Sequence, residues 1–323
     1  MTSCILITGG FGYLGGRIAV ELAKNQGWIV RLGSRKPHLS PDWLPQAQSV
    51  TMDVLDLQSI ISALSGVSAV VHLAAMNEYE CVTDPHKAVL VNTFGTFNVL
   101  QAAISLGVER FIYFSTAHVY GSPLVGNITE ETLPKPLHPY AITHRAAEDF
   151  VLAAHAQKKI TGLVVRLSNG FGAPTHPDIN RWTLLVNDLC RQAVQTRKLV
   201  LRSSGLQQRD FITLEDVACG VNHLLQLSLK NCEDGLFNLG GNNSLTVWEM
   251  VQKISQQCEI RLGFLPNIER PAQSINEQII KLNYNLHKIE KTGFYLKSKV
   301  NREINRTLEI CDQVFGKETH DIN

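Results

Sequence analysis

The chain has 323 residues, enough for one large domain or two fused ones, and 44% of them are hydrophobic. Thirty Lys and Arg against 29 Asp and Glu leave a formal net charge of +1, and the basic residues are dispersed, which argues against a nucleic-acid partner. The seven cysteines form no C-x-x-C or Cys/His cluster, so we expect no metal site and a reducing compartment. No apolar run approaches the roughly 18 residues of a membrane span. These features predict a cytoplasmic protein without a membrane partner.

Short apolar runs alternate with helix-like stretches through the first half of the chain. The runs that predict strands are Cys4–Thr8, Trp28–Leu32, Ser49–Asp53, Ala69–Leu73, Phe111–Ser115, Gly162–Leu167 and, later, Leu236–Leu239. Between them, Leu14–Lys24 and Ala88–Ser105 carry apolar residues at three- and four-residue spacing. Apolar strands that alternate with amphipathic helices predict a parallel sheet covered on both faces. The expected fold class is therefore α/β, a doubly wound Rossmann sheet.

The rhythm of strands and helices breaks after Arg166, which indicates a second region. We expect residues 1–169, with about 211–240, to form a dinucleotide-binding domain. Residues 170–210 and 241–323 are expected to form a smaller, mostly helical substrate lobe that closes over the carboxyl edge of the sheet.

A glycine-rich turn, Thr8-Gly9-Gly10-Phe11-Gly12-Tyr13-Leu14-Gly15, follows the first strand and opens the first helix. Gly9 permits a tight turn, Gly12 lets the backbone approach a pyrophosphate, and Gly15 lets helix and strand pack closely. Tyr13 and Leu14 begin the helix whose N-terminus would face the anion. The strand–turn–helix context favours a nicotinamide dinucleotide site.

The second predicted strand ends in Gly33-Ser34-Arg35-Lys36, where an NAD-binding chain carries an acidic residue. A hydroxyl and a guanidinium would bind a 2′-phosphate, which a carboxylate would repel. The charges therefore favour NADP(H) through Ser34 and Arg35. NAD(H) remains open, because Arg35 and Lys36 could also lie on a solvated loop.

Further motifs follow the glycine turn in a set order. They are Asp53-Val54, Val71-His72-Leu73-Ala74-Ala75, Asn92 within Val-Asn-Thr-Phe-Gly-Thr, Ser115-Thr116-Ala117-His118-Val119-Tyr120-Gly121, Tyr140 within Pro-Tyr-Ala-Ile-Thr-His, Arg166-Leu167-Ser168-Asn169, and Arg209 within Gln-Gln-Arg-Asp-Phe. From about residue 4 to about 310, the chain resembles the extended short-chain dehydrogenase/reductases that act on nucleotide sugars, the NAD-dependent epimerase/dehydratase family.

The resemblance implies a role for each motif. Asp53 and Val54 would contact the adenine, the backbone of Leu73, Ala74 and Ala75 would pass beside the cofactor, and Asn92 would be the family's helix asparagine. Thr116 would carry the catalytic hydroxyl and Tyr140 would exchange the proton. Asn169 and Arg209 would hold the substrate diphosphate, for which a guanidinium is well suited.

The chain departs from the family's Tyr-x-x-x-Lys pattern, because His144 stands four residues after Tyr140. The spacing keeps both side chains on one helix face, toward the cofactor ribose. A lysine there binds the ribose and lowers the pKa of the tyrosine, whereas a histidine supplies charge only when protonated. Three readings follow: Tyr140 acts mainly as a general acid, the oxidised cofactor supplies the missing charge, or the site is attenuated and the protein only binds.

The substrate side of the predicted cleft has fewer signals. Ala117-His118 replaces the Asp-Glu pair of relatives that eliminate water, so dehydration is disfavoured, and His118 could touch substrate. Glu78 and Glu80 follow Ala75 on an expected solvated loop, from which they could shape a sugar pocket. The helices around 88–105 and 140–156 resemble the pair that forms the family's dimer contact. Their apolar stripes would suit either a dimer or the intramolecular core, and we expect a homodimer.

These observations favour an NADPH-dependent 4-ketoreductase, which exchanges hydride with a ring carbon, C4, of a nucleotide-diphosphate hexose. An NDP-sugar 4-epimerase with retained NAD is the first alternative. A catalytically attenuated, NAD(P)-binding regulatory protein is an alternative of another class. Retention of Thr116, Tyr140, Asn169 and Arg209 favours an enzyme over a sensor.

Overall fold

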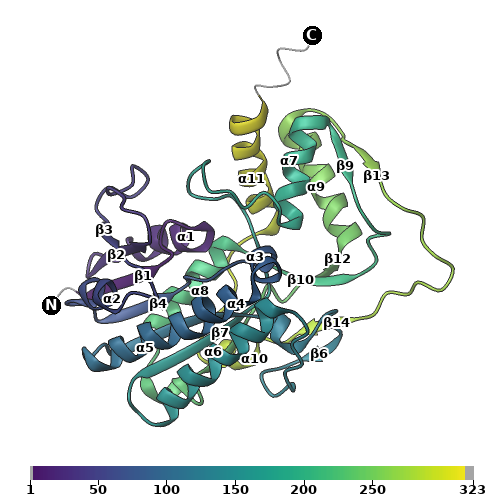
Figure 1. Cartoon of the computed structure of the whole chain (residues 1–323). Coiled ribbons are helices and arrows are strands. Elements are labelled where there is room, and N and C mark those ends of the chain that lie inside the picture. Colours follow the sequence, from purple (N-terminus) through teal and green to yellow (C-terminus); the bar gives the residue numbers. More distant parts are fainter. Residues whose placement is uncertain (1–2, 317–323) are drawn as a thin grey trace.

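The computed structural model describes residues 3–316, and its centre is a seven-stranded sheet (Figure 1). The strands are β1 (Ser3–Thr8), β2 (Trp28–Ser34), β3 (Gln48–Thr51), β4 (Ala69–His72), β5 (Arg110–Thr116), β7 (Thr161–Leu167) and β11 (Leu236–Leu239). They lie in the order β11-β7-β5-β4-β1-β2-β3, and every neighbouring pair is parallel. The predicted α/β fold class is confirmed, and each strand expected from the sequence lies in this sheet.

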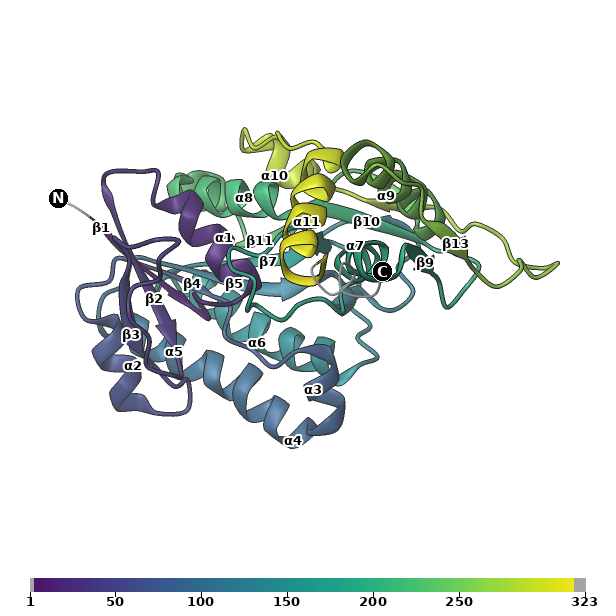
Figure 2. The ribbon, with the colours of Figure 1, turned by 90° about the horizontal axis from the view of Figure 1, so that it is seen from above.

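Helices cover both faces of the sheet, as the view from above shows (Figure 2). One face is covered by α1 (Tyr13–Leu22) and α8 (Leu214–Gln226), and the other by α2 (Leu57–Leu64), α5 (Gly95–Ser105) and α6 (Pro139–Ala156). Side chains of one strand alternate between the two cores: Ile5 and Ile7 belong to the first, and Leu6 to the second. Burial on both faces explains why these strands are continuously apolar in sequence.

The stretch Pro85–Ser105 joins α4 (Pro85–Ala88), a π-helical turn η1 (Val89–Phe94) and α5. By length and composition alone this stretch is apolar enough to cross a membrane, which the sequence analysis did not anticipate. Half of its most apolar window is buried inside the protein. Asn92 and Thr96 are buried polar residues within it that hydrogen-bond inside the domain, as in a helix that covers a sheet.

The second region of the chain, the expected lobe, has its own core and more strand than expected. Its elements are β8 (Asn169–Phe171), α7 (Leu185–Thr196), β9 (Lys198–Val200), β10 (Gln208–Thr213), β12 (Ser244–Thr246), α9 (Val247–Leu262), β13 (Asn267–Glu269) and α11 (Val300–Phe315). The helices α7, α9 and α11 pack around a third apolar cluster that includes Phe171 and Phe211. Both expected parts of the lobe, before 210 and after 241, contribute to this cluster.

One segment departs from the expected division of the chain. Strand β14 (Leu282–Tyr284) pairs with β6 (Gly126–Ile128) of the large domain, and α10 (His287–Lys291) follows it. Leu286, Ile289 and Phe294 are buried in the first core, beside the short turns η2 (Ala117–Tyr120) and η3 (Leu229–Cys232). Residues 282–294 therefore pack with the large domain, although the sequence assigned them to the lobe. The ends of both predicted domains, residues 1–2 and 317–323, lie outside the described residues.

Candidate active site

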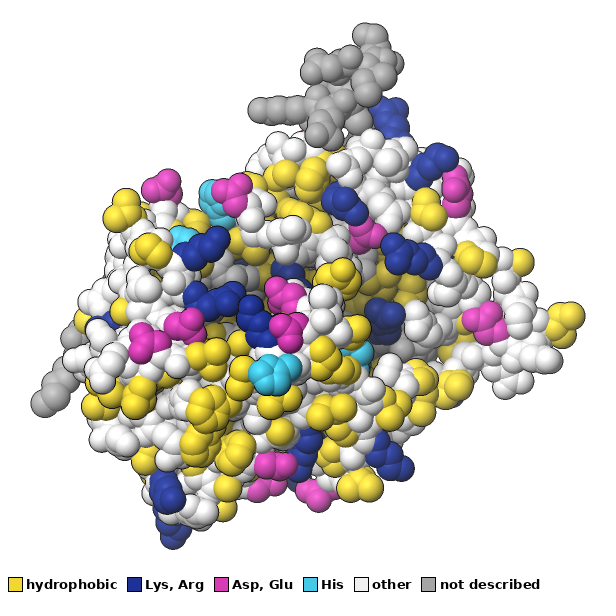
Figure 3. Space-filling view, in the orientation of Figure 1, with side chains coloured by type: hydrophobic (Ala, Val, Ile, Leu, Met, Phe, Trp, Pro, Cys, Tyr) yellow, Lys and Arg dark blue, Asp and Glu magenta, His cyan; other side chains and the backbone are white. Residues whose placement is uncertain are grey.

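A cavity of about 1220 Å³ runs along the carboxyl edge of the sheet and under the lobe. Figure 3 shows the hollow, with basic and acidic side chains gathered around its mouth. The expected cofactor residues that line it are Gly9, Gly12, Tyr13, Leu14, Gly15, Ser34, Arg35, Val54, Leu73, Ala74, Ala75, Tyr140 and His144. The expected substrate residues Thr116, His118, Asn169 and Arg209 line it too, whereas Asp53 and Asn92 do not. We call the part lined by the glycine turn and the ends of β2 and β4 the cofactor half.

The glycine turn has the geometry that an anion site needs. Gly9 has φ +68°, a backbone conformation that favours glycine. A Cβ on Gly15 would lie 2.3 Å from the Gly9 carbonyl oxygen, so only glycine lets α1 approach the turn this closely. No side chain caps α1. The first N–H groups of that helix are therefore left to face the cavity, where a phosphate can accept from them.

The end of β2 supplies positive charge to the cofactor half. Ser34, Arg35 and Lys36 line the cavity, and neither basic side chain has an ion-pair partner within residues 3–316. The Asp53 carboxylate does not enter this wall, because it turns back to accept from Leu55 N at 2.9 Å. Val54 takes the wall position, and the role of Asp53 as a cofactor contact stays a prediction.

A buried polar chain fixes the backbone beside the cofactor half. Thr8 Oγ1 accepts from the N–H groups of Leu73 and Ala74, so its own proton goes to His72 Nδ1 at 2.8 Å. His72 Nε2 then donates to Thr96 Oγ1 at 3.1 Å. Burial, and secondly the nearby His144, lower the pKa of His72 to about 3, so the ring is neutral.

Asn92 acts from outside the cavity. Its Oδ1 accepts from Met76 N at 2.7 Å and its Nδ2 donates to Thr143 Oγ1 at 3.1 Å. The side chain thereby ties the segment after β4 to helix α6, which carries Tyr140. The expected contact of Asn92 with the cofactor stays a prediction. The structure shows that Asn92 positions these two elements through its two hydrogen bonds.

Tyr140 and His144 lie on one face of α6, with ring centroids 4.2 Å apart. His144 Nδ1 donates to the Tyr140 carbonyl oxygen at 2.8 Å, which leaves Nε2 as an acceptor without a partner among the described residues. Burial lowers the pKa of His144, so the ring is neutral at pH 7. It can accept a hydrogen bond from a ribose hydroxyl, whereas a lysine would donate one.

The surroundings of Tyr140 keep its hydroxyl protonated. Enclosure in the cavity, and secondly the Glu78 carboxylate, raise the pKa of Tyr140, and Arg181 offsets only part of this rise. No cation stands at position 144 to favour the phenolate. Tyr140 is therefore equipped as a proton donor rather than as a base.

The substrate residues meet the cavity from β5, β8 and β10. Thr116 is buried at the end of β5, where its Oγ1 accepts from His118 N; the neighbouring Ser115 hydroxyl is buried with no partner among residues 3–316. Asn169 Nδ2 donates to the Asp210 carbonyl oxygen at 2.9 Å. Arg209 has no hydrogen-bond or ion-pair partner in the described chain, and burial lowers its pKa. An unpaired, partly buried guanidinium is a natural receptor for an anion.

Residues 5–240 match the model of the NAD-dependent epimerase/dehydratase family. The chain belongs to this family. It is 30% identical to the UDP-glucose 4-epimerase of Bacillus subtilis over 277 residues, which cover 77% of this chain and 80% of that relative. It is 28% identical to the dTDP-D-glucose 4,6-dehydratase of Mus musculus, over 78% of this chain and 72% of the relative.

The fold is similar to that of the UDP-glucuronic acid 4-epimerase of Bacillus cereus, solved with UDP-glucuronic acid and NAD. The TM-score is 0.79 at 21% identity, over 96% of this chain and 99% of that one. The likeness shows the extended short-chain dehydrogenase fold. As a family member the chain is an enzyme that binds a nicotinamide cofactor, and the uncapped helix, the glycine turn and the open wall at Ser34 fit that group.

The wall of the cavity formed by α3 (Glu78–Thr83) and the segment before α7 was mostly not predicted from the sequence. Glu78 lies on this helix, and not on the expected loop. The Asn77-x-x-Glu80 capping box that begins α3 was the signal for this helix. Arg181 enters from the segment before α7, which has no motif of its own. We call the part of the cavity lined by α3, Arg181 and Arg209 the lobe half.

Proposed function

We propose that this enzyme transfers hydride between NADP(H) and C4 of a nucleotide-diphosphate hexose, in the direction that reduces a 4-keto sugar. The supporting observation is that Tyr140, which is protonated, shares one cavity with cations of both halves that are unpaired among the described residues. These are Arg35 and Lys36 in the cofactor half and Arg209 in the lobe half. In the seven-stranded sheet, β2, which Arg35 follows, and β7 lie on opposite sides of β5. Arg209 lies on β10, which pairs with β8 in a separate three-stranded sheet. A cofactor phosphate suits the first cation and a substrate diphosphate the second.

In this mechanism the reduced nicotinamide supplies the hydride to the carbonyl carbon. Tyr140 donates its proton to the carbonyl oxygen, and its raised pKa keeps the hydroxyl in the protonated form that a donor needs. Thr116 holds the same oxygen from the end of β5. His144, neutral, accepts from the cofactor ribose through Nε2 and so fixes the ring relative to Tyr140. Arg209 and Asn169 hold the diphosphate and set which sugar carbon reaches Tyr140.

The cofactor preference can be tested separately from the reaction. Isothermal titration of protein stripped of nucleotide should give NADPH binding at least about tenfold tighter than NADH binding, equivalent to about 1.4 kcal/mol. Ser34→Ala combined with Arg35→Gln should remove that preference. Arg202→Gln, an exposed arginine that does not line the cavity, is the matched control. A wild-type preference for NADH contradicts the NADP proposal.

The reaction is tested by turnover of 4-keto nucleotide sugars with NADPH, followed at 340 nm. Tyr140→Phe should lower kcat by about 10²–10⁴-fold, the range for loss of a general acid, with cofactor affinity retained. Full turnover by Tyr140→Phe on an identified substrate rules out this role.

A 4-epimerase is the second candidate, favoured by the 30% identity to the epimerase of Bacillus subtilis. Such an enzyme returns the hydride to the opposite ring face and keeps its nicotinamide bound. Denatured protein would then release stoichiometric NAD, and a nucleotide sugar would change configuration without added cofactor. The attenuated, regulatory alternative instead predicts tight cofactor binding with no turnover of any nucleotide sugar.

We further propose that the enzyme is a homodimer in the cytoplasm. Leu90, Phe94, Ile142 and Phe150 of η1 and α6 expose apolar side chains on the outer face of the domain. We propose that the same face of a second copy packs against it, as in the helix pair that forms the dimer contact in the family that the sequence resembles. Light scattering should report a dimer, and Phe94→Asp with Phe150→Asp should give monomers.

All seven cysteines are free thiols, which suits a reducing compartment such as the cytoplasm.

A further inference from the structure

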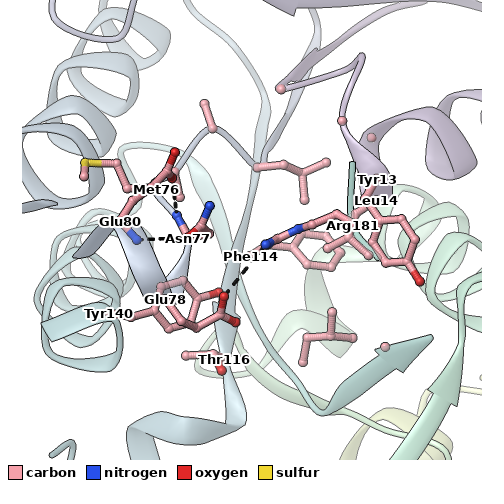
Figure 4. A pocket seen from close by; sticks show the side chains of 18 of the residues that line it. Tyr13, Leu14, Met76, Asn77, Glu78, Glu80, Phe114, Thr116, Tyr140 and Arg181 are labelled. Atoms are coloured by element: carbon pink, nitrogen blue, oxygen red, sulfur yellow. Dashed lines mark hydrogen bonds and ion pairs between the residues drawn. The ribbon is translucent and has the colours of Figure 1, made fainter. Parts of the chain in front are cut away.

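The lobe half contains an ion pair that crosses the cavity. Glu78 Oε2 on α3 lies 3.9 Å from Arg181 Nη1, and the two side chains are 48% and 31% exposed. In Figure 4 Arg181 reaches across the pocket toward Glu78, and the carboxylate lies beside Tyr140 and above Thr116. The pair therefore stands where a sugar ring held at Tyr140 would have to fit.

Glu78 is not needed to build the helix on which it lies. Asn77 caps α3, and Glu80 completes the capping box by accepting from Asn77 N at 2.9 Å. Asp84 in turn caps α4 through Lys87 N. The carboxylates of Glu80 and Asp84 thus accept hydrogen bonds from backbone N–H groups. Among residues 3–316, Glu78 has only the 3.9 Å ion pair with Arg181, so its lone pairs remain available in the cavity.

Among the described residues, the cations that line the lobe half of the cavity are Arg181, Arg209 and Lys87 of α4. Lys87 is exposed, so solvent screens its charge. Arg181 is matched by Glu78, and Arg209 is the group suited to the diphosphate. His144 is held neutral by burial. A sugar that carried its own carboxylate would bring a second negative charge beside Glu78, in a partly enclosed space where charges interact strongly. A sugar hydroxyl can instead donate to the carboxylate.

We propose that Glu78 is a specificity-determining residue, which accepts a hydrogen bond from an uncharged hexose and rejects hexoses that carry a carboxylate. This inference rests on the proposed function, because it assumes a nucleotide sugar in the lobe half. Arg181 moderates the rejection, since it compensates the Glu78 charge. The proposal separates this enzyme from the Bacillus cereus structure, which contains UDP-glucuronic acid.

The test compares two ligands that differ only at C6, UDP-glucose and UDP-glucuronate, by isothermal titration against the full chain saturated with NADPH. Wild type should bind UDP-glucose at least about tenfold more tightly, which is about 1.4 kcal/mol. Glu78→Gln, which keeps size and removes charge, should bring the two affinities within about threefold. Arg181→Gln should widen the ratio, because Glu78 is then uncompensated.

Glu80→Gln is the matched control, because Glu80 lines the same wall and a glutamine can still cap the helix. It should leave the ratio at the wild-type value, and thermal melts of all variants verify that they fold. Equal affinities in wild type, or an unchanged ratio in Glu78→Gln, overturn the specificity role while nucleotide sugars still bind. A further titration uses dTDP-glucose. If neither UDP-sugar nor dTDP-glucose binds, the proposed function itself fails, and so does the inference that rests on it.

Discussion

The two halves of the cavity are built in different ways. In the cofactor half the shape comes from backbone: the turn at Gly9, the uncapped start of α1 and the segment after β4 that Thr8 holds. In the lobe half it comes from side chains, chiefly Glu78, Arg181 and Arg209, that project from elements of separate lobes. Backbone geometry permits few residue types, whereas a projecting side chain can be exchanged without disturbing the fold.

This difference indicates which part of the cavity can change between members of one family without disturbing the fold. A change in the cofactor half disturbs the structure that every member needs, so effects there should be large and general. A change in the lobe half should alter which sugar binds and leave the cofactor in place.

The largest effect is expected from Gly15→Ala. The new Cβ would lie 2.3 Å from the Gly9 carbonyl oxygen and 2.8 Å from Gly10 Cα, both of them backbone atoms that cannot give way locally. Cofactor affinity measured by titration should fall by about 100-fold or more, equivalent to about 2.7 kcal/mol.

The control for this substitution is Gly27→Ala, whose Cβ would meet only the Asn25 side chain, at 3.3 Å. That variant should bind cofactor as wild type does. Wild-type affinity in Gly15→Ala would mean that the turn can shift, and the backbone account of the cofactor half would be wrong.

Arg209→Gln should have the next largest effect, confined to the lobe half. Loss of charge-assisted hydrogen bonds to the diphosphate, worth about 1.5–3 kcal/mol, should weaken UDP-sugar binding by about 10–100-fold. Cofactor affinity should not change, and the exposed Arg202→Gln should change neither. Equal weakening of cofactor and sugar by Arg209→Gln would abolish the division into two halves.

The sequence predicted the cofactor half well for the same physical reason. Turns that need glycine, and strands buried on both faces, restrict the residues allowed, so Gly9, Gly15 and the seven strands could be read directly. Two side-chain positions could not be predicted from the sequence: the Asp53 carboxylate accepts from Leu55 N of its own loop, and Asn92 Oδ1, outside the cavity, accepts from Met76 N. Their contacts with the cofactor stay predictions.

The lobe half was hard to predict because its residues come together only through tertiary packing. Glu78 and Arg181 are 103 positions apart, and no spacing rule links α3 to the segment before α7. Residues 282–294 present the same difficulty, since their return to the first core depends on the pairing of β14 with β6. Only the capping box of α3 was available as a local signal.

Acid should lower the free energy of unfolding through His72, whose hydrogen bonds support the cofactor half. Its folded pKa of about 3 lies below the unfolded value of about 6.5, so the unfolded chain binds the proton first and stability falls as pH drops from about 6.5 toward 3. Between pH 7 and pH 5 this group should remove about 2 kcal/mol from the free energy of unfolding. His144, with its lowered pKa, acts in the same direction.

Urea titrations at the two pH values measure this effect. His72→Gln should reduce the pH dependence by about 2 kcal/mol, whatever it does to stability at pH 7, and substitution of the exposed His86 should leave the dependence intact. A pH dependence that survives in His72→Gln would mean that other groups control acid unfolding.

The smallest effect is expected where the sequence departs most visibly from its family. His144→Gln replaces one neutral group with another that can still accept from the ribose, so kcat for reduction should fall by no more than about threefold. Between pH 6.5 and 8.5 the wild-type profile of kcat should show no step from His144, because burial holds its pKa below 6.5.

His144→Lys provides the opposing variant, because it restores a cation beside Tyr140 and so stabilises the phenolate. Oxidation of a sugar hydroxyl, in which Tyr140 must accept a proton, should therefore reach its maximal rate at lower pH in His144→Lys than in wild type. A large loss of reduction in His144→Gln, with a kcat that follows a histidine titration, would show that the charged imidazolium is the working form. The neutral acceptor assigned to Nε2 would then be wrong, and Tyr140 would be activated much as in relatives that keep the lysine.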